Sequence, residues 1–348
     1  MKRRSYLDWN ATAPLRPESR EAMLAAMDVV GNPSSVHAEG RKAKALVERA
    51  RQQVATALGA DGADVIFTSG ATEAAALACV GRDLHGSGVE HDAVKAWVTC
   101  DLDVSDEGRV SVEAPEQSVL QLANSETGVV QDLPSGLAVS DLTQAFGKIP
   151  FAFNWLGCEA ALVSAHKLGG PKGIGALVVK RGTEVEALLK GGGQEMGRRA
   201  GTENIIGIAG FGAAAEAASR DLANGLWEET AEVRDSLEAR IADAVPEAIF
   251  PGKPSRRLPN TSCIAVPGWK GETQVMQMDL AGYAISAGSA CSSGKVKASS
   301  VLLAYGCTEE VASSAIRVSI GPDTSKEEID GFATAWLAQR NKARNRAA

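Results

Sequence analysis

The chain has 348 residues, which is long enough to predict two domains rather than one small core. Hydrophobic residues make up 45% of it and charged residues 23%, a balance that excludes a disordered chain. The net charge of −7 gives no reason to expect a nucleic-acid or anionic-membrane partner. Apolar runs stay well below the roughly 20 residues of a membrane span, and the charged N-terminus has no apolar signal core.

Cysteine and glycine usage narrows the class of protein further. The six cysteines and four histidines contain no CxxC pair and no zinc-finger spacing, so we expect no metal site. Thiols without a disulfide framework fit a reducing, cytoplasmic location. The 36 glycines are about one residue in ten, above the usual share of roughly 7%. This surplus predicts turns and anion-binding loops.

Apolar periodicity predicts an α/β organisation in the first two thirds of the chain. Residues 36–60 carry apolar side chains at helical spacing, and the apolar strand 65–67 is followed by a glycine turn and a helix over 71–77. Strand, glycine turn and helix together open an α/β unit. Further strands are predicted at residues 118–123, 137–141, 160–164 and 174–180.

The last third has a different pattern, and we place a domain boundary near residue 225, with one continuous domain as the alternative. A charged amphipathic helix is predicted over 227–245. A capping box at 325–328 starts a final helix. Between them the sequence predicts a strand at 261–266, a helix at 272–280 and short strands at 284–285 and 316–320.

Three polar segments follow apolar strands, where parallel strands present their carboxyl ends to ligands. Lys167 lies in such a glycine-rich loop, and a desolvated lysine there can form a Schiff base, although a surface lysine is the alternative. Asp141 can hold a proton on a pyridine nitrogen, or cap the next helix. Residues 69–72 open a helix and suit a phosphate, or serve as a plain N-cap.

Two loops of small residues add further candidates. Residues 286–294 are too small to pack a core, so we expect an exposed loop there. Cys291 lies within it and is a candidate nucleophile, because an accessible thiol is available to react. The glycine- and arginine-rich segment 191–202 suits anionic groups.

Together these segments resemble those of cysteine desulfurases, in the same order from about Tyr6 to Gly321. Cysteine desulfurases are pyridoxal-phosphate (PLP) enzymes of the class V aminotransferase group that supply sulfur for iron–sulfur clusters. The small-residue loop around Cys291 resembles the branch with a long mobile loop. The matching segments are YLDWNATAPL, GNPSSVHAEGR, FTSGATE, EHDAV, NSETGVVQ, SAHKLGGPKGIGAL, GGGQEMGRRAGTEN, SAGSACSSGKVK and SAIRVSIG.

The resemblance implies an α/β fold, the PLP-dependent transferase fold of type I. Residues 15–225 would form a large domain around a mostly parallel sheet of the seven-stranded type. Residues 1–14 and 226–348 would form a smaller α+β domain that carries Cys291 and Arg317. A homodimer is also implied.

The resemblance further implies a role for each matching residue. Lys167 would be the Schiff-base lysine and the base, His91 would stack on the ring, and Cys291 would attack the substrate sulfur. Asp141 would pair with the pyridinium nitrogen and Gln144 with the phenolic oxygen of the ring. The phosphate would be held by Ala71, Thr72, Ser164 and His166, with Thr202 reaching in from the second subunit.

Substrate binding and turnover follow in the same way. Arg317 would clamp the α-carboxylate of L-cysteine, since a guanidinium suits a two-pronged contact, and Asn124 would also bind substrate. L-cysteine would displace Lys167 on the cofactor and lose its α-proton. The reaction would leave L-alanine and a persulfide on Cys291, and the sulfur would then pass to an acceptor protein.

The sequence departs from the family pattern at several positions. Ser125 stands where the family usually has an asparagine that contacts the cofactor, so that contact is expected to be lost or mediated by water. Met196 replaces an arginine, and alanines occupy the usually polar positions 74–76.

The chain is also short in the large domain. Residues 132–140 are too few for the usual helix plus strand, and residues 92–118 are too few for two helices and their strands. We therefore expect one or two covering helices to be missing. A parallel sheet needs both faces covered, so we expect a bare apolar patch over strands 118–123 and 137–141, covered by another protein or by an altered dimer.

Three functions remain open from the sequence. A working cysteine desulfurase is the leading interpretation, favoured by the loop around Cys291. A related lyase or aminotransferase, acting for example on selenocysteine or a sulfinate, is the second interpretation. The Cys291 thiol argues against it, because transamination needs no such thiol. A specialised scaffold of the same fold with little turnover is supported by Ser125, Met196 and the deletions.

Overall fold

A seven-stranded sheet forms the centre of the larger part of the molecule. The computed structural model describes residues 4–288 and 298–347. Five strands pair directly, and an isolated parallel bridge between His85 and Ser118 joins a two-stranded extension to them. The strand order is β2 (Asp64–Thr68), β8 (Gly175–Val179), β7 (Ala160–Ser164), β6 (Val139–Asp141) and β5 (Val119–Gln121), followed by β3 (His85–Ser87) and β4 (Thr99–Leu102).

The direction of the strands confirms the predicted fold class. β8 runs antiparallel to both of its neighbours, whereas β7, β6 and β5 pair in parallel, as do β3 and β4. A mostly parallel sheet is therefore present, as expected for a type I PLP-dependent transferase fold. Because parallel strands end on the same edge, the carboxyl ends of β6 and β7 lie side by side.

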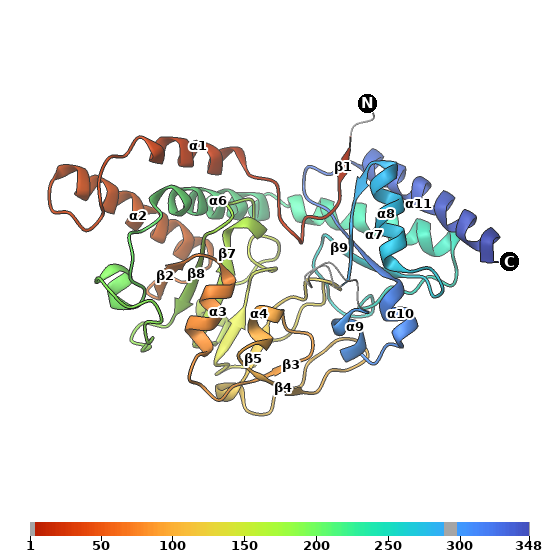
Figure 1. The fold of residues 1–348 in the computed structure, drawn as a ribbon, viewed down its shortest axis with the longest axis horizontal. Coiled ribbons are helices and arrows are strands. Elements are labelled where there is room, and N and C mark those ends of the chain that lie inside the picture. The colour runs from red at the N-terminus through yellow and green to blue at the C-terminus, as the bar shows by residue number, and fades with distance from the viewer. Residues whose placement is uncertain (1–3, 289–297, 348) are drawn as a thin grey trace.

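Helices cover both faces of this sheet (Figure 1). Residues alternate between the faces, so Leu120 belongs to one hydrophobic cluster and its neighbour Val119 to another. The Leu120 face packs with α2 and α6, and α1 lies against α6. The Val119 face packs with α3 and α4. The bounds are α1 (Pro17–Met27), α2 (Ala38–Ala57), α3 (Ala71–Cys79), α4 (Asp92–Lys95) and α6 (Ile205–Ala223).

A separate hydrophobic cluster lies in the C-terminal part, around Leu7, Ile241 and Trp336. Its sheet is antiparallel, in the order β11 (Ser286–Ala287), β12 (Ala315–Ser319) and β9 (Thr261–Ala265). A short parallel pair, β1 (Ser5–Tyr6) with β10 (Tyr283–Ala284), ties the N-terminal segment to it. We propose the domain boundary near residue 225 on this division. The helices are α7 (Leu226–Ala244), α8 (Gly271–Ala281), α9 (Ser300–Ala304), α10 (Glu309–Ser314) and α11 (Lys326–Ala347).

Most elements expected from periodicity are present with shifted ends, but α1 and α6 were not anticipated. α6 has the sequence IIGIAGFGAAAEAASRDLA and buries ten of its residues, so it shows no polar face whose spacing would indicate a helix. Glycines are required by its packing, since a Cβ on Gly212 would lie 2.8 Å from the Cα of Ala50 in α2. Its alanines favour a helix, and its buried face comes from packing against α1 and α2.

The segments that lead into β5 and β6 contain little helix. No helix lies between β5 and β6, only the short 3₁₀ turn Pro115–Gln117 lies between β4 and β5, and the described chain there is otherwise loop. α5 (Phe153–Leu156) and the 3₁₀ turns Ala165–Lys167 and Gln194–Gly197 complete the described helical segments.

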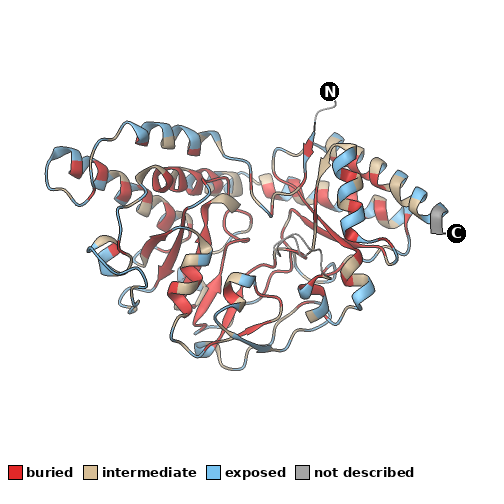
Figure 2. Cartoon of the chain, in the orientation of Figure 1, coloured by how far each residue is buried: buried red, intermediate tan, exposed pale blue. Residues whose placement is uncertain are grey.

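The expected bare apolar face, however, was wrong. Residues 118–123 and 137–142 are all buried within the single chain (Figure 2). Loop side chains replace the missing helices, because Val110, Val112 and Leu133 pack against the same cluster as Leu120. The structure therefore gives no reason to invoke an additional protein over these strands.

No helix in residues 4–288 or 298–347 is both long and apolar enough to cross a membrane.

Replacing Leu120 by alanine tests this packing. Leu120 is 1% exposed, so the Leu120→Ala variant is expected to lose about 2–5 kcal/mol of unfolding free energy by leaving a cavity. The exposed Leu24 of α1 provides the control, and Leu24→Ala should change the same quantity by less than about 1 kcal/mol. Denaturant titration measures both. Equal effects would show that Leu120 is not packed in the core.

Candidate active site

A cavity of about 580 Å³ opens at the carboxyl ends of β6 and β7. Asp141 is the last residue of β6 and Ser164 the last of β7, so the parallel strands deliver both side chains to one edge. The start of α3 supplies another wall. Of the residues predicted for the site, those lining this cavity are Ala71, Thr72, His91, Ser125, Asp141, Gln144, Ser164, His166 and Lys167.

Lys167 lies in the 3₁₀ turn directly after β7 and reaches across the cavity to the N-terminal segment. Its Nζ donates to the backbone oxygens of Asn10, at 2.5 Å, and Ala11, at 3.0 Å. Gln144 donates from Nε2 to the same oxygen of Asn10 at 3.0 Å. The amine and the amide are therefore held at one point on the wall.

Asp141 is held rigidly at the end of its strand. It is 9% exposed, and its Oδ1 accepts a 2.8 Å hydrogen bond from the backbone N–H of Thr143. The hydroxyl of Thr143, which also lines the cavity, has no hydrogen-bond partner in the described structure. A carboxylate fixed in this way is suited to receive a protonated ring nitrogen.

The opposite end of the cavity is suited to an anion. α3 begins at Ala71 without a side-chain cap, so its first backbone N–H groups are available beside Ala71 and Thr72. The start of β8 approaches the turn before α3 closely there, since a Cβ on Gly175 would lie 2.8 Å from the Cα of Gly70. Only glycine at position 175 leaves that approach open.

His166 adds a neutral ring to the same end. Burial, followed by the nearby Lys167 and Lys172, lowers the pKa of His166 to about 4, so the imidazole is neutral at physiological pH. Its Nδ1 is buried without a hydrogen-bond partner in the described structure. Such an orphaned atom indicates a ligand in the working protein.

His91 lines the cavity at the N-cap of α4, where its Nδ1 accepts from the backbone N–H of Ala93 at 3.1 Å. Ser125 also lines it, and its backbone oxygen accepts from Asn10 at 3.0 Å and from Arg317 at 3.1 Å. The cavity wall at Ser125 is therefore tied to both the N-terminal segment and β12.

The remaining predicted residues do not line the cavity. Arg317 pairs with Asp8 at 2.8 Å and is 8% exposed, with its Nε buried and without a partner in the described structure. Asn124 uses its Oδ1 to accept from the backbone N–H groups of Glu126 and Thr127, which stabilises the turn after β5. Thr202 is exposed on this chain. Cys291 lies outside the described residues.

Two residues at the site were missed by sequence reasoning. Asn10 is 1% exposed and bonds both Lys167 and Gln144, and Lys148 is 2% exposed and donates to Gln144 Oε1 at 2.7 Å. Asn10 lies within the first matching segment, YLDWNATAPL, which could have drawn attention to it. Nothing in the local sequence marks Lys148 as buried, because lysines are usually exposed.

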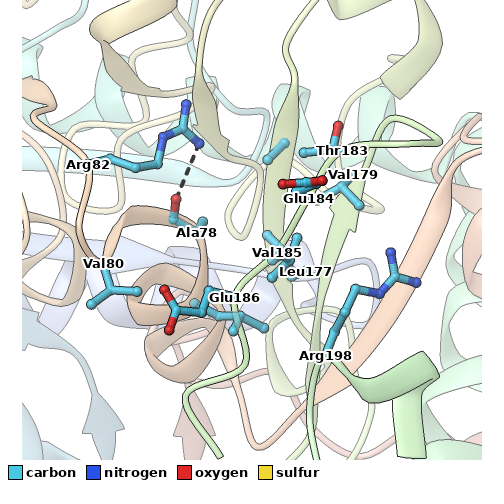
Figure 3. A pocket seen from close by; sticks show the side chains of 12 residues that line it. Ala78, Val80, Arg82, Leu177, Val179, Thr183, Glu184, Val185, Glu186 and Arg198 are labelled. Carbon is cyan, nitrogen blue, oxygen red and sulfur yellow. Dashed lines mark hydrogen bonds between the residues drawn. The ribbon is translucent and has the colours of Figure 1, made fainter. Parts of the chain in front are cut away.

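A second hollow of about 540 Å³ lies away from these residues (Figure 3). Apolar side chains from α3 and β8, including Ala78 and Leu177, share its lining with Arg82, Glu186 and Arg198. Arg82 donates back to the Ala78 oxygen at 3.3 Å. This second hollow contains none of the residues predicted for catalysis.

Glu90, next to His91, is a buried carboxyl behind the site. Burial raises the pKa of Glu90 to about 8, even though its Oε1 accepts from the backbone N–H of Gln121 at 3.1 Å. Its Oε2 is buried without a hydrogen-bond partner in the described structure, so no donor stabilises a negative charge on that oxygen.

The Glu90→Gln variant is therefore expected to change how stability depends on pH. Folded Glu90 keeps its proton up to about pH 8, whereas the unfolded chain loses it near 4.5, so the free energy of unfolding falls as pH rises between these values. Glutamine has no proton to lose, so the variant should have a higher free energy of unfolding than the wild type at pH 9. At pH 5 the two values should match. Denaturant titration at both pH values measures this, with the exposed Glu116→Gln as control. A parallel decline in both proteins would contradict it.

Comparisons with known proteins agree with this geometry. The class-V aminotransferase family matches residues 5–95 and 114–332, and the unmatched residues 96–113 lie in the shortened segment. A cysteine desulfurase IscS of Dictyoglomus turgidum is 35% identical, covering 95% of this chain and 93% of its own length. A cysteine desulfurase of Cereibacter sphaeroides is 39% identical, covering 94% and 93%.

Solved structures give the same answer. A NifS-like protein from Rickettsia africae superposes with a TM-score of 0.88 at 30% identity, covering 97% of this chain and 99% of that one. Another NifS-like protein has a TM-score of 0.85 at 28% identity, covering 97% and 99%. The chain belongs to the class-V aminotransferase family, in its cysteine desulfurase branch.

Proposed function

We propose that this protein is a PLP-dependent cysteine desulfurase that converts L-cysteine to L-alanine and collects the sulfur as a persulfide on Cys291. The observation that supports this most strongly is the convergence of Lys167, Asp141 and Gln144 on one cavity. An uncapped helix start and an orphaned His166 nitrogen lie in the same cavity. One of the solved structures similar to this chain is of a protein in complex with cysteine.

The residues present fit the cofactor. The phosphate would be held by the start of α3 at Ala71 and Thr72, together with Ser164 and His166, where unsatisfied donors already exist. Asp141 would hold the ring nitrogen in its protonated state. Bound PLP supplies an electron sink for the substrate α-carbon.

In the proposed reaction, the protein's own groups bind, orient and move protons. The Lys167 amine would bind the cofactor and later take the α-proton of the substrate. Arg317 would grip the α-carboxylate, and its guanidinium is held next to the cavity wall by Asp8 and by the backbone oxygen of Ser125. His91 would stack on the ring at the cavity mouth.

Sulfur transfer balances without an external oxidant. The thiolate of Cys291 attacks the substrate sulfur, forming an S–S bond while the substrate C–S bond breaks. The bonding pair stays with the substrate carbon, which takes up a proton and leaves as alanine, so the carbon is reduced and the sulfur of Cys291 becomes a persulfide. An acceptor protein thiol would then remove the outer sulfur.

A homodimer is part of the proposal. Thr202 is exposed and lies outside this chain's own cavity, as a residue that serves the phosphate of a second subunit would be. A scaffold of the same fold with little turnover is the second candidate. It is supported by the short Ser125 side chain at the cavity and by the 66% exposed Met196.

Replacing Lys167 by alanine tests the cofactor assignment. The wild-type protein mixed with PLP is expected to show visible absorbance of the bound cofactor and to release sulfide and alanine from L-cysteine with a reductant. Lys167→Ala should lose the absorbance and nearly all turnover, since it removes the amine that binds the cofactor. The exposed Lys180→Ala serves as control and should retain both. Absorbance without turnover in the wild type would favour the scaffold.

Replacing Cys291 by alanine tests the sulfur-transfer step separately. This variant should still bind PLP with wild-type absorbance, because the thiol takes no part in holding the cofactor. Sulfide release should fall by at least about 100-fold, since the nucleophile is gone. Sulfide production at the wild-type rate would rule out a Cys291 persulfide.

A further inference from the structure

Lys148 is a buried amine that the proposed reaction does not use. It is 2% exposed, and no carboxylate in residues 4–288 or 298–347 pairs with it. Its Nζ has two recorded acceptors, Gln144 Oε1 at 2.7 Å and Asn10 Oδ1 at 3.1 Å. Burial lowers the pKa of Lys148 well below its usual value. Placing an amine here costs free energy, so its two contacts call for an explanation.

Both contacts bear on the orientation of the Gln144 amide. The Asn10 backbone oxygen can only accept, so the Gln144 atom that meets it at 3.0 Å must be the NH₂ group. The N–H groups of Lys148 then meet the Gln144 oxygen. A flipped amide would set an oxygen against the Asn10 carbonyl, and the Gln144 oxygen would lose its hydrogen bond from Lys148.

This orientation decides what Gln144 offers to the cavity. One N–H of its NH₂ group goes to the Asn10 oxygen, and the second has no recorded acceptor in the described structure. The same Asn10 oxygen accepts from Lys167 at 2.5 Å. A donor N–H therefore lies beside the amine that is proposed to bind the cofactor, within the cavity that Gln144 lines.

We propose that Lys148 is a positioning residue that fixes the Gln144 amide with an N–H toward the cavity, so that the ligand atom beside it must be a hydrogen-bond acceptor. This inference rests on the proposed function, in which that atom is the phenolic oxygen of PLP. Lys148 itself does not line the cavity and touches no substrate.

The donor has a consequence that can be measured on the bound cofactor. A hydrogen bond to the phenolic oxygen spreads its negative charge, which weakens its hold on the proton shared with the Lys167 nitrogen. When the donor is lost, that proton is held more tightly. The pH at which the visible absorbance of the bound cofactor changes should therefore rise, by about one unit for one lost hydrogen bond.

The test combines Lys148→Met, Gln144→Ala and the double variant. Each single variant should weaken PLP binding by about tenfold and raise the spectral midpoint. Because Lys148 acts through Gln144, adding Lys148→Met to Gln144→Ala should change neither quantity further. Additive effects, or a Lys148→Met protein identical to the wild type in both, would overturn the inference.

Two further variants keep the test decisive. Gln144→Glu keeps the size of the side chain but presents an oxygen in place of the N–H, so it should bind PLP more weakly than Gln144→Ala; binding equal to the wild type would overturn the inference even if Lys148→Met did not fold. Asn260 donates to the same Asn10 Oδ1 at 3.0 Å without touching Gln144, and Asn260→Ala is the matched control. Its spectral midpoint should stay at the wild-type value, whereas an equal rise would assign the effect to Asn10.

Failure of the proposed function would look different. A wild-type protein that binds no PLP would reject the cofactor assignment itself. A wild-type protein that binds PLP, with no change in the variants, would reject only the role of Lys148.

Discussion

Asn10 lies where the two parts of the molecule meet, and all four of its polar atoms are used. Its backbone N–H donates to Ser319 Oγ at 3.0 Å, and its side-chain Nδ2 donates to Thr261 Oγ1 at 2.8 Å, both in the C-terminal sheet. Its backbone oxygen accepts hydrogen bonds from Gln144 and Lys167, which follow strands β6 and β7 of the large sheet. One residue thus couples the antiparallel sheet to the groups that line the cavity, so their positions depend on how the two parts pack.

The charge around the cavity follows from the same packing. Lys167, Lys172 and His166 gather at the ends of β7 and β8, and Lys148 lies behind them. Lys148 lacks a carboxylate in the described structure, and the Arg317 pair with Asp8 leaves one guanidinium nitrogen unused. The lysines and His166 that line the cavity make it suited to an anionic ligand with several acceptor oxygens.

The large sheet shows how a parallel fold tolerates deletion. Covering helices are absent around β5 and β6, yet these strands stay buried because loop residues such as Val110 and Leu133 pack on them. The carboxyl ends that hold Asp141 and Ser164 lie side by side, because β6 and β7 pair in parallel register from Val139 to Asp141. A short covering layer is thus compatible with a well-formed site edge.

Sequence reasoning found the strands that end in Asp141 and Ser164, because short apolar runs followed by polar and glycine residues have a local signature. It also found nine residues that share one cavity, since each belongs to a recognisable segment. It missed α6, whose glycine and alanine residues show no polar face, and it wrongly expected a bare sheet face. Burial by loops depends on contacts between residues far apart in the chain, which no local pattern records.

The sequence by itself determined which strands exist and which lysine, aspartate and cysteine residues accompany them. It also determined which family the chain resembles. What only the tertiary structure decided is how these groups are held. The bonds from Lys148 and Lys167 to Asn10 join residues 138 and 157 positions apart. A buried lysine and an exposed one are identical in sequence, and only the packing around Lys148 gives it a partner and an orientation.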